Sequence, residues 1–205
     1  KAVKILGGYS GAGAERDAQL FTTTLDAGQV AWHGFVVTTD ALIDGLTITR
    51  GNALYDQDID GGGMFITDCS ATVTGCTFVR NASYRSGGGI ALSGAHGTVI
   101  ADCTFTENFA GAHGGAIYCY DSDAAITGCL FLRNEASTVA QGWGGAIMND
   151  QGAPSIIGCT FTENLAHFGA GICNWRSEAL VESCTFADCN ALTACGGGLY
   201  NTGGS

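Results

Sequence analysis

The sequence predicts an all-β fold, a right-handed single-stranded parallel β-helix with coils of about 26 residues. A Cys-x-Phe segment recurs five times, and a Gly-rich segment ending in Ile or Leu follows each copy. No stretch shows the three-and-four apolar spacing of a helix. We expect residues 1–205 to form one domain, with less regular first coils in residues 1–40 and repeat coils in residues 41–205.

The repeat has a nearly constant length. Successive cysteines of the segment are separated by 27 (76 to 103), 26 (103 to 129), 30 (129 to 159) and 25 (159 to 184) residues. Cys and Phe stand two apart, so on a strand both side chains point to one face and the Thr between them to the other. Strands of successive coils then pair in parallel about 4.8 Å apart, and the handedness usual for parallel connections is right-handed.

The first 40 residues are the least repetitive. Val3–Leu6 alternates and ends at Gly7, which indicates a strand of the first coil. The polar segment Ser10–Gln19 is expected to be a solvated loop. The aromatic residues of Ala31–Val37 are expected to help cover the end of the core.

Stacking turns each repeated position into a ladder of equal side chains. The Phe ladder is expected to be a buried aromatic stack, and the Asn ladder to lie at a bend, where Asn tolerates left-handed backbone and bonds its neighbours. The predicted ladder residues are Phe78, Phe105, Phe131, Phe161, Phe186, Asn81, Asn108, Asn134 and Asn164. We interpret them as structural, and we predict no catalytic residue.

The combination of Phe-x-x-Asn with Gly-Gly-Ala-Ile resembles the repeat of polymorphic-outer-membrane-protein-type β-helices, over residues from about 41 to 201. Departures are Ala170 inside the Gly pair and Cys189 in place of the ladder Asn. The resemblance implies a pectate-lyase-like solenoid in an exported protein, at the cell surface or outside the cell, with a non-catalytic structural or adhesive role. Parallel β-helices also include polysaccharide lyases and glycoside hydrolases, so a carbohydrate-active enzyme and a glycan-binding module stay open as alternatives.

Charge and end composition restrict the partners. The net charge of −11 argues against nucleic acid, and no run of about 18 apolar residues predicts insertion into a membrane. Neither end of the sequence shows a capping helix, and uncovered coils of a solenoid expose strand edges and core. We therefore expect the ends to be uncapped and to contact copies of the chain end to end, as in a filament, or the rest of a longer surface protein.

One acidic segment is a candidate Ca²⁺ site. Asp56, Asp58 and Asp60, followed by Gly61, have the one, three, five spacing of oxygen ligands in calcium loops. Position twelve of such a loop falls on Thr67 instead of Glu, and an acidic loop facing water is the alternative.

The ten cysteines include five that share the inward face with Phe, which predicts a buried thiol ladder. Cys189 and Cys195 are a candidate disulfide, since one replaces the ladder Asn and the other precedes the next glycines. No Cys-x-x-Cys occurs, which disfavours a metal site built from cysteines.

Four aromatic residues are expected on one turn column, where a stripe of rings would suit stacking of sugar rings or another protein. These candidate ligand-facing residues are Tyr84, Phe109, Trp143 and Phe168. The alternative, which we favour, is that they fold back over the loops. The sequence shows no nucleophile and base pair of the kind that catalysis needs.

Overall fold

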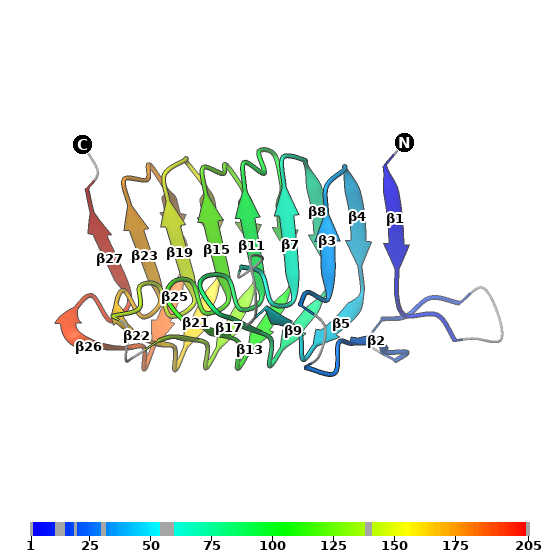
Figure 1. The fold of residues 1–205 in the computed structure, drawn as a ribbon, viewed down its shortest axis with the longest axis horizontal. Coiled ribbons are helices and arrows are strands. Elements are labelled where there is room, and N and C mark those ends of the chain that lie inside the picture. The colour runs from blue at the N-terminus through cyan, green and yellow to red at the C-terminus, as the bar shows by residue number, and fades with distance from the viewer. Residues whose placement is uncertain are drawn as a thin grey trace.

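The computed structural model describes residues 2–10, 15–18, 20–29, 32–53, 60–137 and 141–203. Its coils stack along one axis, with the N-terminal coil at one end and the C-terminal coil at the other (Figure 1). Strands of neighbouring coils pair in parallel, and each coil from residue 41 onward passes through four sheets in the same order. The predicted parallel β-helix is confirmed.

We name the four sheets A to D in the order in which a coil visits them. Sheet A contains β1 (Val3–Leu6), β4 (Ala41–Asp44), β8 (Ala71–Thr74), β12 (Val99–Ala101), β16 (Ala125–Thr127), β20 (Ser155–Ile157) and β24 (Leu180–Glu182). Sheet B contains β2 (Thr23–Asp26), β5 (Leu46–Thr49), β9 (Thr77–Val79), β13 (Thr104–Thr106), β17 (Leu130–Leu132), β21 (Thr160–Thr162) and β25 (Thr185–Ala187). Sheet C contains β6 (Asn52–Ala53), β10 (Ala82–Ser83), β14 (Phe109–Ala110), β18 (Glu135–Ala136), β22 (Leu165–Phe168) and β26 (Asn190–Cys195). Sheet D contains β3 (Phe35–Val37), β7 (Met64–Thr67), β11 (Ile90–Ser93), β15 (Ile117–Tyr120), β19 (Ile147–Asp150), β23 (Ile172–Trp175) and β27 (Leu199–Thr202).

The less regular N-terminal segment already belongs to the solenoid. β1, β2 and β3 pair with β4, β5 and β7, so the first coil contributes to three of the four sheets. Arg16 lies in the excursion between β1 and β2 and forms an ion pair with Asp44 at 2.7 Å. None of the described residues forms a helix with the length and apolar character needed to cross a membrane.

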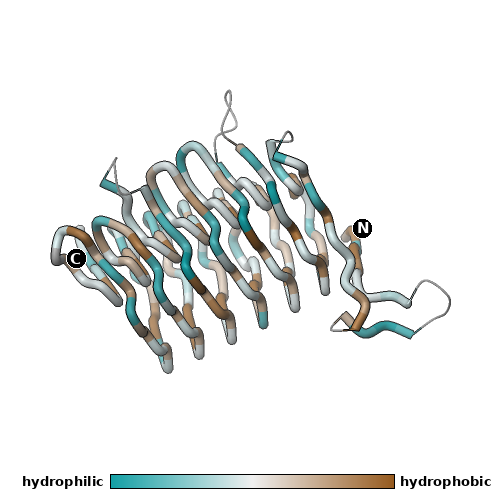
Figure 2. The backbone as a smooth tube through the Cα atoms, turned by 90° about the horizontal axis from the view of Figure 1, so that it is seen from below, coloured by the Kyte–Doolittle hydropathy of each residue, from teal (hydrophilic) through white to brown (hydrophobic). Residues whose placement is uncertain are grey.

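The Phe ladder lies on the inward side of sheet B, as predicted. Neighbouring rings from Phe78 to Phe186 stack with centroids 4.8–5.0 Å apart and planes within 4–11° of each other. The four rings from Phe78 to Phe161 are fully buried, and each contributes about 1.5–3 kcal/mol by burial. Apolar and polar residues recur at equivalent places of successive coils, as the hydropathy colouring shows (Figure 2).

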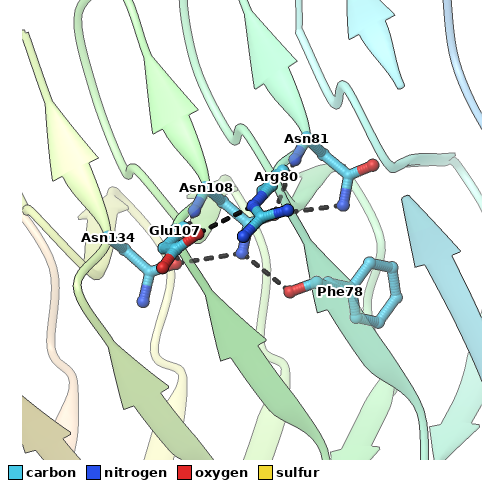
Figure 3. Close-up of polar contacts among 6 residues, drawn as sticks. All are labelled: Phe78, Arg80, Asn81, Glu107, Asn108 and Asn134. Carbon is cyan, nitrogen blue, oxygen red and sulfur yellow. Dashed lines mark hydrogen bonds and ion pairs between the residues drawn. The ribbon is translucent and has the colours of Figure 1, made fainter. Parts of the chain in front are cut away.

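The Asn ladder is also confirmed, and Asn108 shows its geometry (Figure 3). The Nδ2 of Asn108 donates to the carbonyl oxygen of Phe78 at 3.0 Å and to the Oδ1 of Asn134 at 2.9 Å. Its Oδ1 accepts from the backbone N–H and the Nδ2 of Asn81, both at 3.1 Å. Each amide therefore joins three consecutive coils from inside the buried corner between sheets B and C.

The left-handed backbone expected at the ladder Asn lies one residue earlier. Arg80 has a φ of 55° and Glu107 a φ of 55°, whereas Asn81 and Asn108 that follow them are not left-handed. These residues face solvent, and Arg80 pairs with Glu107 at 2.8 Å (Figure 3). The Asn side chain thus supplies the hydrogen bonds of the bend, and the residue before it takes the turn.

A second Asn ladder, which the sequence analysis missed, lies inside sheet D. The Nδ2 of Asn149 donates to the Oδ1 of Asn174, and the Nδ2 of Asn174 to the Oδ1 of Asn201, both at 2.7 Å. In the preceding coils the same inward position holds Leu92 and Cys119. This inward column of sheet D therefore changes from apolar side chains to hydrogen-bonded Asn side chains toward the C-terminal end.

The inward cysteine column is a set of free thiols, as predicted. The Sγ of Cys103 contacts the carbonyl oxygen of Val73 in the preceding coil at 3.6 Å and that of Ala101 at 3.2 Å. The other members repeat this arrangement: Cys76, Cys129, Cys159 and Cys184. These thiols fill the corner between sheets A and B and contact its carbonyl groups.

Candidate ligand-binding groove on sheet D

The outer face of sheet D carries large side chains that the alternation of its strands turns away from the core. In β15 the inward residues are Ile117 and Cys119, so Tyr118 and Tyr120 point outward. The equivalent outward positions of β19 and β23 include Asp150 and Trp175, which pair in register with Tyr120 and with each other. Along the axis, these outward positions therefore place the Asp150 carboxylate beside the aromatic rings of Tyr120 and Trp175.

Residues directly before the Gly segments of β15, β19 and β23 form one wall above this face. His113 pairs with Trp143, and Trp143 with Phe168, so these three residues form one column along the helix axis. The column is held close to the sheet by the glycines that follow it. Gly114 has a φ of 61°, and a Cβ on Gly115 would lie 2.3 Å from the carbonyl oxygen of Gly145.

Two adjoining hollows lie between this wall and the sheet. The larger one has a volume of about 450 Å³, and its lining includes Asp60, Arg85, Tyr118 and Tyr120. The smaller one has a volume of about 240 Å³ and is lined by His113, Trp143, Met148, Asp150 and Trp175. His113 and Asp150 line both, so we treat the two hollows as one groove along sheet D.

The aromatic rings at the smaller hollow contact each other. The Trp143 ring lies 4.8 Å from that of Trp175 with an interplanar angle of 62°, and 5.3 Å from that of Phe168. Tyr200 extends the cluster, with its centroid 5.6 Å from Phe168 and 6.5 Å from Trp143. The plane of the Trp143 ring therefore makes angles of 56–82° with the rings of these three neighbours.

The carboxylates of the groove differ in their partners: Asp60 forms an ion pair with Arg85, whereas Asp150 has no cation partner among the described residues. Asp60 forms an ion pair with Arg85, whose Nε donates to its Oδ1 at 3.1 Å, and the same oxygen accepts from the backbone N–H of Ser86 at 2.9 Å. Asp150 accepts a hydrogen bond from Tyr118 Oη at 3.1 Å. Among the ion pairs of the described residues, none includes Asp150.

Burial favours the neutral forms of two neighbours of Asp150. Desolvation raises the pKa of Tyr118 well above its usual range, and the Asp150 carboxylate raises it further. Desolvation also lowers the pKa of His113, although Asp150 opposes this shift. Near pH 7 the groove therefore contains a phenol and a neutral imidazole beside a carboxylate.

The structure splits the predicted aromatic stripe. Trp143 and Phe168 share a column, but Phe109 aligns with Ala82 and Glu135 in sheet C, and Tyr84 is 63% exposed in the following turn. In the structure, the turn residues directly before the Gly pair face sheet D, and those directly after the ladder Asn do not. The sequence repeat alone does not distinguish these two groups. Residues of the groove that the sequence analysis did not recognise are His113, Tyr118, Tyr120, Asp150 and Trp175 as one group. Tyr118, Tyr120, Asp150 and Trp175 stand at the second or fourth position of a strand that follows the Gly segment, whereas His113 stands directly before it.

The predicted calcium segment is only partly described. Asp56 and Asp58 lie outside the described residues, and Asp60 is bound to Arg85 and Ser86. Among the residues that the structure describes, no group of three His, Cys, Asp or Glu side chains is suited to hold a metal ion. The calcium site stays a prediction.

Cys189 and Cys195 are both free thiols in the structure, in place of the predicted disulfide. Cys189 occupies the ladder position, where its Sγ contacts the carbonyl oxygen of Phe161 at 3.6 Å and the Nδ2 of Asn164 at 3.8 Å. Cys195 lies at the other end of β26, in register with Phe168. The two residues therefore end in different columns of the solenoid.

The comparisons with known proteins identify the fold family. A family model described as a right handed beta helix region matches residues 29–186. No curated protein and no solved structure matches the chain significantly.

Proposed function

Because the chain belongs to the right-handed β-helix family, we propose that it is a non-catalytic, extracellular surface protein that binds glycans in the sheet D groove. The observation that carries the proposal is the gathering of Tyr118, Tyr120, Trp143 and Trp175 around one carboxylate in a groove that crosses several coils. Aromatic faces suit the apolar faces of sugar rings, and a few polar groups in an otherwise apolar cleft fix orientation.

The groove suits a chain-like ligand. It runs along the axis of the solenoid, and its two hollows adjoin at His113 and Asp150. Ligands that extend over several units gain contacts in both hollows. The scaffold supports this arrangement, because the stacked Phe and Asn ladders hold successive coils at a fixed separation.

Affinity electrophoresis and intrinsic fluorescence with soluble polysaccharides test the proposal. The chain has three Trp residues, and two of them line the smaller hollow, so bound sugar should change the emission. Trp175→Ala should weaken retention, whereas Trp32→Ala, which removes a 46% exposed indole outside the groove, should not. Retention that is equal in both variants, or absent for all glycans, would refute glycan binding at this site.

A carbohydrate-active enzyme is the second candidate, favoured by the Tyr118–Asp150 hydrogen bond inside the groove. Glycoside hydrolysis commonly needs two carboxyl groups, one of them a proton donor. Asp60 is held by Arg85, which leaves Asp150 as the carboxylate of the groove that no cation compensates among the described residues. Release of reducing ends that disappears in Asp150→Asn would support the enzyme and overturn the non-catalytic proposal.

We also propose that the partners expected from the sequence cover the C-terminal edge of the solenoid. In the last described coil, Leu199 is 38% exposed and Phe186 is only partly buried, although both occupy inward columns. Copies of the chain stacked end to end, or the rest of a longer surface protein of the polymorphic-outer-membrane-protein type, would bury these side chains. Electron microscopy of the purified chain tests end-to-end stacking, since isolated short rods would contradict it.

A further inference from the structure

We propose that the smaller hollow of the groove binds an organic ammonium group, which makes an amine-bearing glycan the preferred ligand. The identification of the ligand as a glycan rests on the proposed function. The ammonium site itself rests on three features of the hollow: its indole walls, its carboxylate and its size.

The indole walls come from Trp143 and Trp175. Their centroids are 4.8 Å apart and their planes meet at 62°, so they form two adjacent sides of the hollow. A cation within about 6 Å of a ring centre is attracted by the ring quadrupole, and Trp is the strongest of the aromatic residues in this respect. The guanidinium of Arg176 lies 5.6 Å from the Trp175 ring centre but does not line the hollow.

The carboxylate of Asp150 supplies the charge that a cation needs. It lines the hollow and accepts a hydrogen bond from Tyr118, a neutral partner. The other carboxylate of the groove, Asp60, is already compensated by Arg85. A cation bound between the indoles would therefore compensate a charge that no ion pair of the described residues neutralises. An anionic glycan would meet repulsion at the same place.

The chemistry of the lining favours an organic cation over a metal ion. Ca²⁺ takes six to eight oxygen ligands, whereas the hollow offers one carboxylate, two indoles, an imidazole and the thioether of Met148. Its volume of about 240 Å³ is below the range of roughly 300–1,000 Å³ of sites that enclose whole drug-sized ligands. It therefore suits one charged group, with the remaining sugar units in the adjoining hollow of about 450 Å³.

The experiment titrates the full chain with three probes while Trp emission is recorded. The probes are glucosamine oligosaccharides, the same oligosaccharides with every amine acetylated, and choline chloride as a minimal cation. At a pH where the sugar amine is protonated, the aminated oligosaccharide should bind about tenfold more tightly or better than its acetylated form. Choline should bind weakly and compete with it.

Two substitutions locate the effect. Asp150→Asn keeps an oxygen that can accept from Tyr118 but removes the charge, so the preference for the amine should fall to about twofold or less. Asp188→Asn is the matched control, because it removes an exposed carboxylate that follows β25 and lines neither hollow, and Asn tolerates its left-handed φ of 52°. It should leave the preference unchanged, and circular dichroism should show that both variants are folded.

The outcomes separate this inference from the proposed function. Equal affinity for the aminated and acetylated oligosaccharides overturns the ammonium site and leaves glycan binding standing. Binding of choline alone, abolished by Asp150→Asn, supports the ammonium site and overturns glycan binding. A preference for the amine that persists in Asp150→Asn overturns the ammonium site, because the charge then comes from elsewhere.

Discussion

Replacing Asn108 by Ala tests whether the Asn ladder holds the coils together. The substitution removes four hydrogen bonds, two donated by the side chain to Phe78 and Asn134 and two accepted from Asn81, with lengths of 2.9–3.1 Å. It also leaves the buried backbone N–H of Asn81 without its acceptor. Asn81 is 1% exposed and Asn108 1% exposed, so water cannot replace these bonds without opening the corner.

The expected magnitude follows from these contacts. A hydrogen bond contributes a net stabilisation of about 1 kcal/mol, and an unsatisfied buried polar group costs about 1–3 kcal/mol. We expect Asn108→Ala to lower the free energy of unfolding by about 3–5 kcal/mol. Asn134→Ala should do the same, because its amide makes the equivalent bonds to Phe105 and Asn164, both at 3.0 Å.

Urea denaturation followed by far-ultraviolet circular dichroism measures these changes. The matched control is Asn190→Ala, which truncates an exposed amide on sheet C and should change the free energy of unfolding by less than about 0.5 kcal/mol. If Asn108→Ala and Asn190→Ala unfolded at the same urea concentration with equal slopes, the ladder would be a by-product of the stacking and not a cause of it.

Three further predictions concern the end of the ladder, the thiols and the groove. Cys189→Asn should raise the free energy of unfolding by about 1–2 kcal/mol, since an Asn there can bond Asn164 and Phe161 as the other ladder residues do, and an unchanged urea midpoint would count against this. A thiol reagent should label four cysteines of the folded protein quickly and the remaining six only on unfolding, because four are partly exposed and six are buried. Rapid labelling of all ten would contradict the buried cysteine column. A total of eight reactive thiols in the unfolded protein, two fewer than ten, would indicate a disulfide. Burial and Asp150 raise the pKa of Tyr118, so the stability that its neutral form contributes is present below the unfolded pKa of about 10 and is lost as pH rises above it. Tyr118→Phe should therefore make the free energy of unfolding less sensitive to alkaline pH. An identical pH profile in the variant would refute the raised pKa of Tyr118.

The fold was predictable because stacking converts a sequence repeat into contacts. Phe78, Phe105 and Phe131 stand at one position of the repeat, and parallel pairing in register places them over one another. The repeat therefore predicts which residues form the inward columns, even when the angles between the sheets of a coil are not known. The position of the left-handed residue was not predictable in the same way. Arg80 and Glu107 have φ values of 55°, but Arg and Glu are not residue types that indicate left-handed backbone.

The candidate site was harder to predict than the core for a related reason. The groove lies between the outer face of sheet D and the turn before it, so its composition depends on how far the turn folds over the sheet. Tyr84 and Trp143 both follow a ladder Asn along the chain, yet only Trp143 aligns with His113 and Phe168. The lengths of the turns differ between coils, and sequence spacing alone does not reveal which turn residues return to the sheet.

The alternation of one strand separates the scaffold from the proposed site. In β19, Ile147 and Asn149 point inward and form part of the core and of the second Asn ladder, whereas Met148 and Asp150 line the groove. A change at Asp150 therefore leaves the inward contacts of its own strand in place, and a change at Asn149 disturbs the strand without altering the charge of the groove. This separation predicts that ligand preference and stability vary independently along sheet D, because they depend on alternate residues of the same strands.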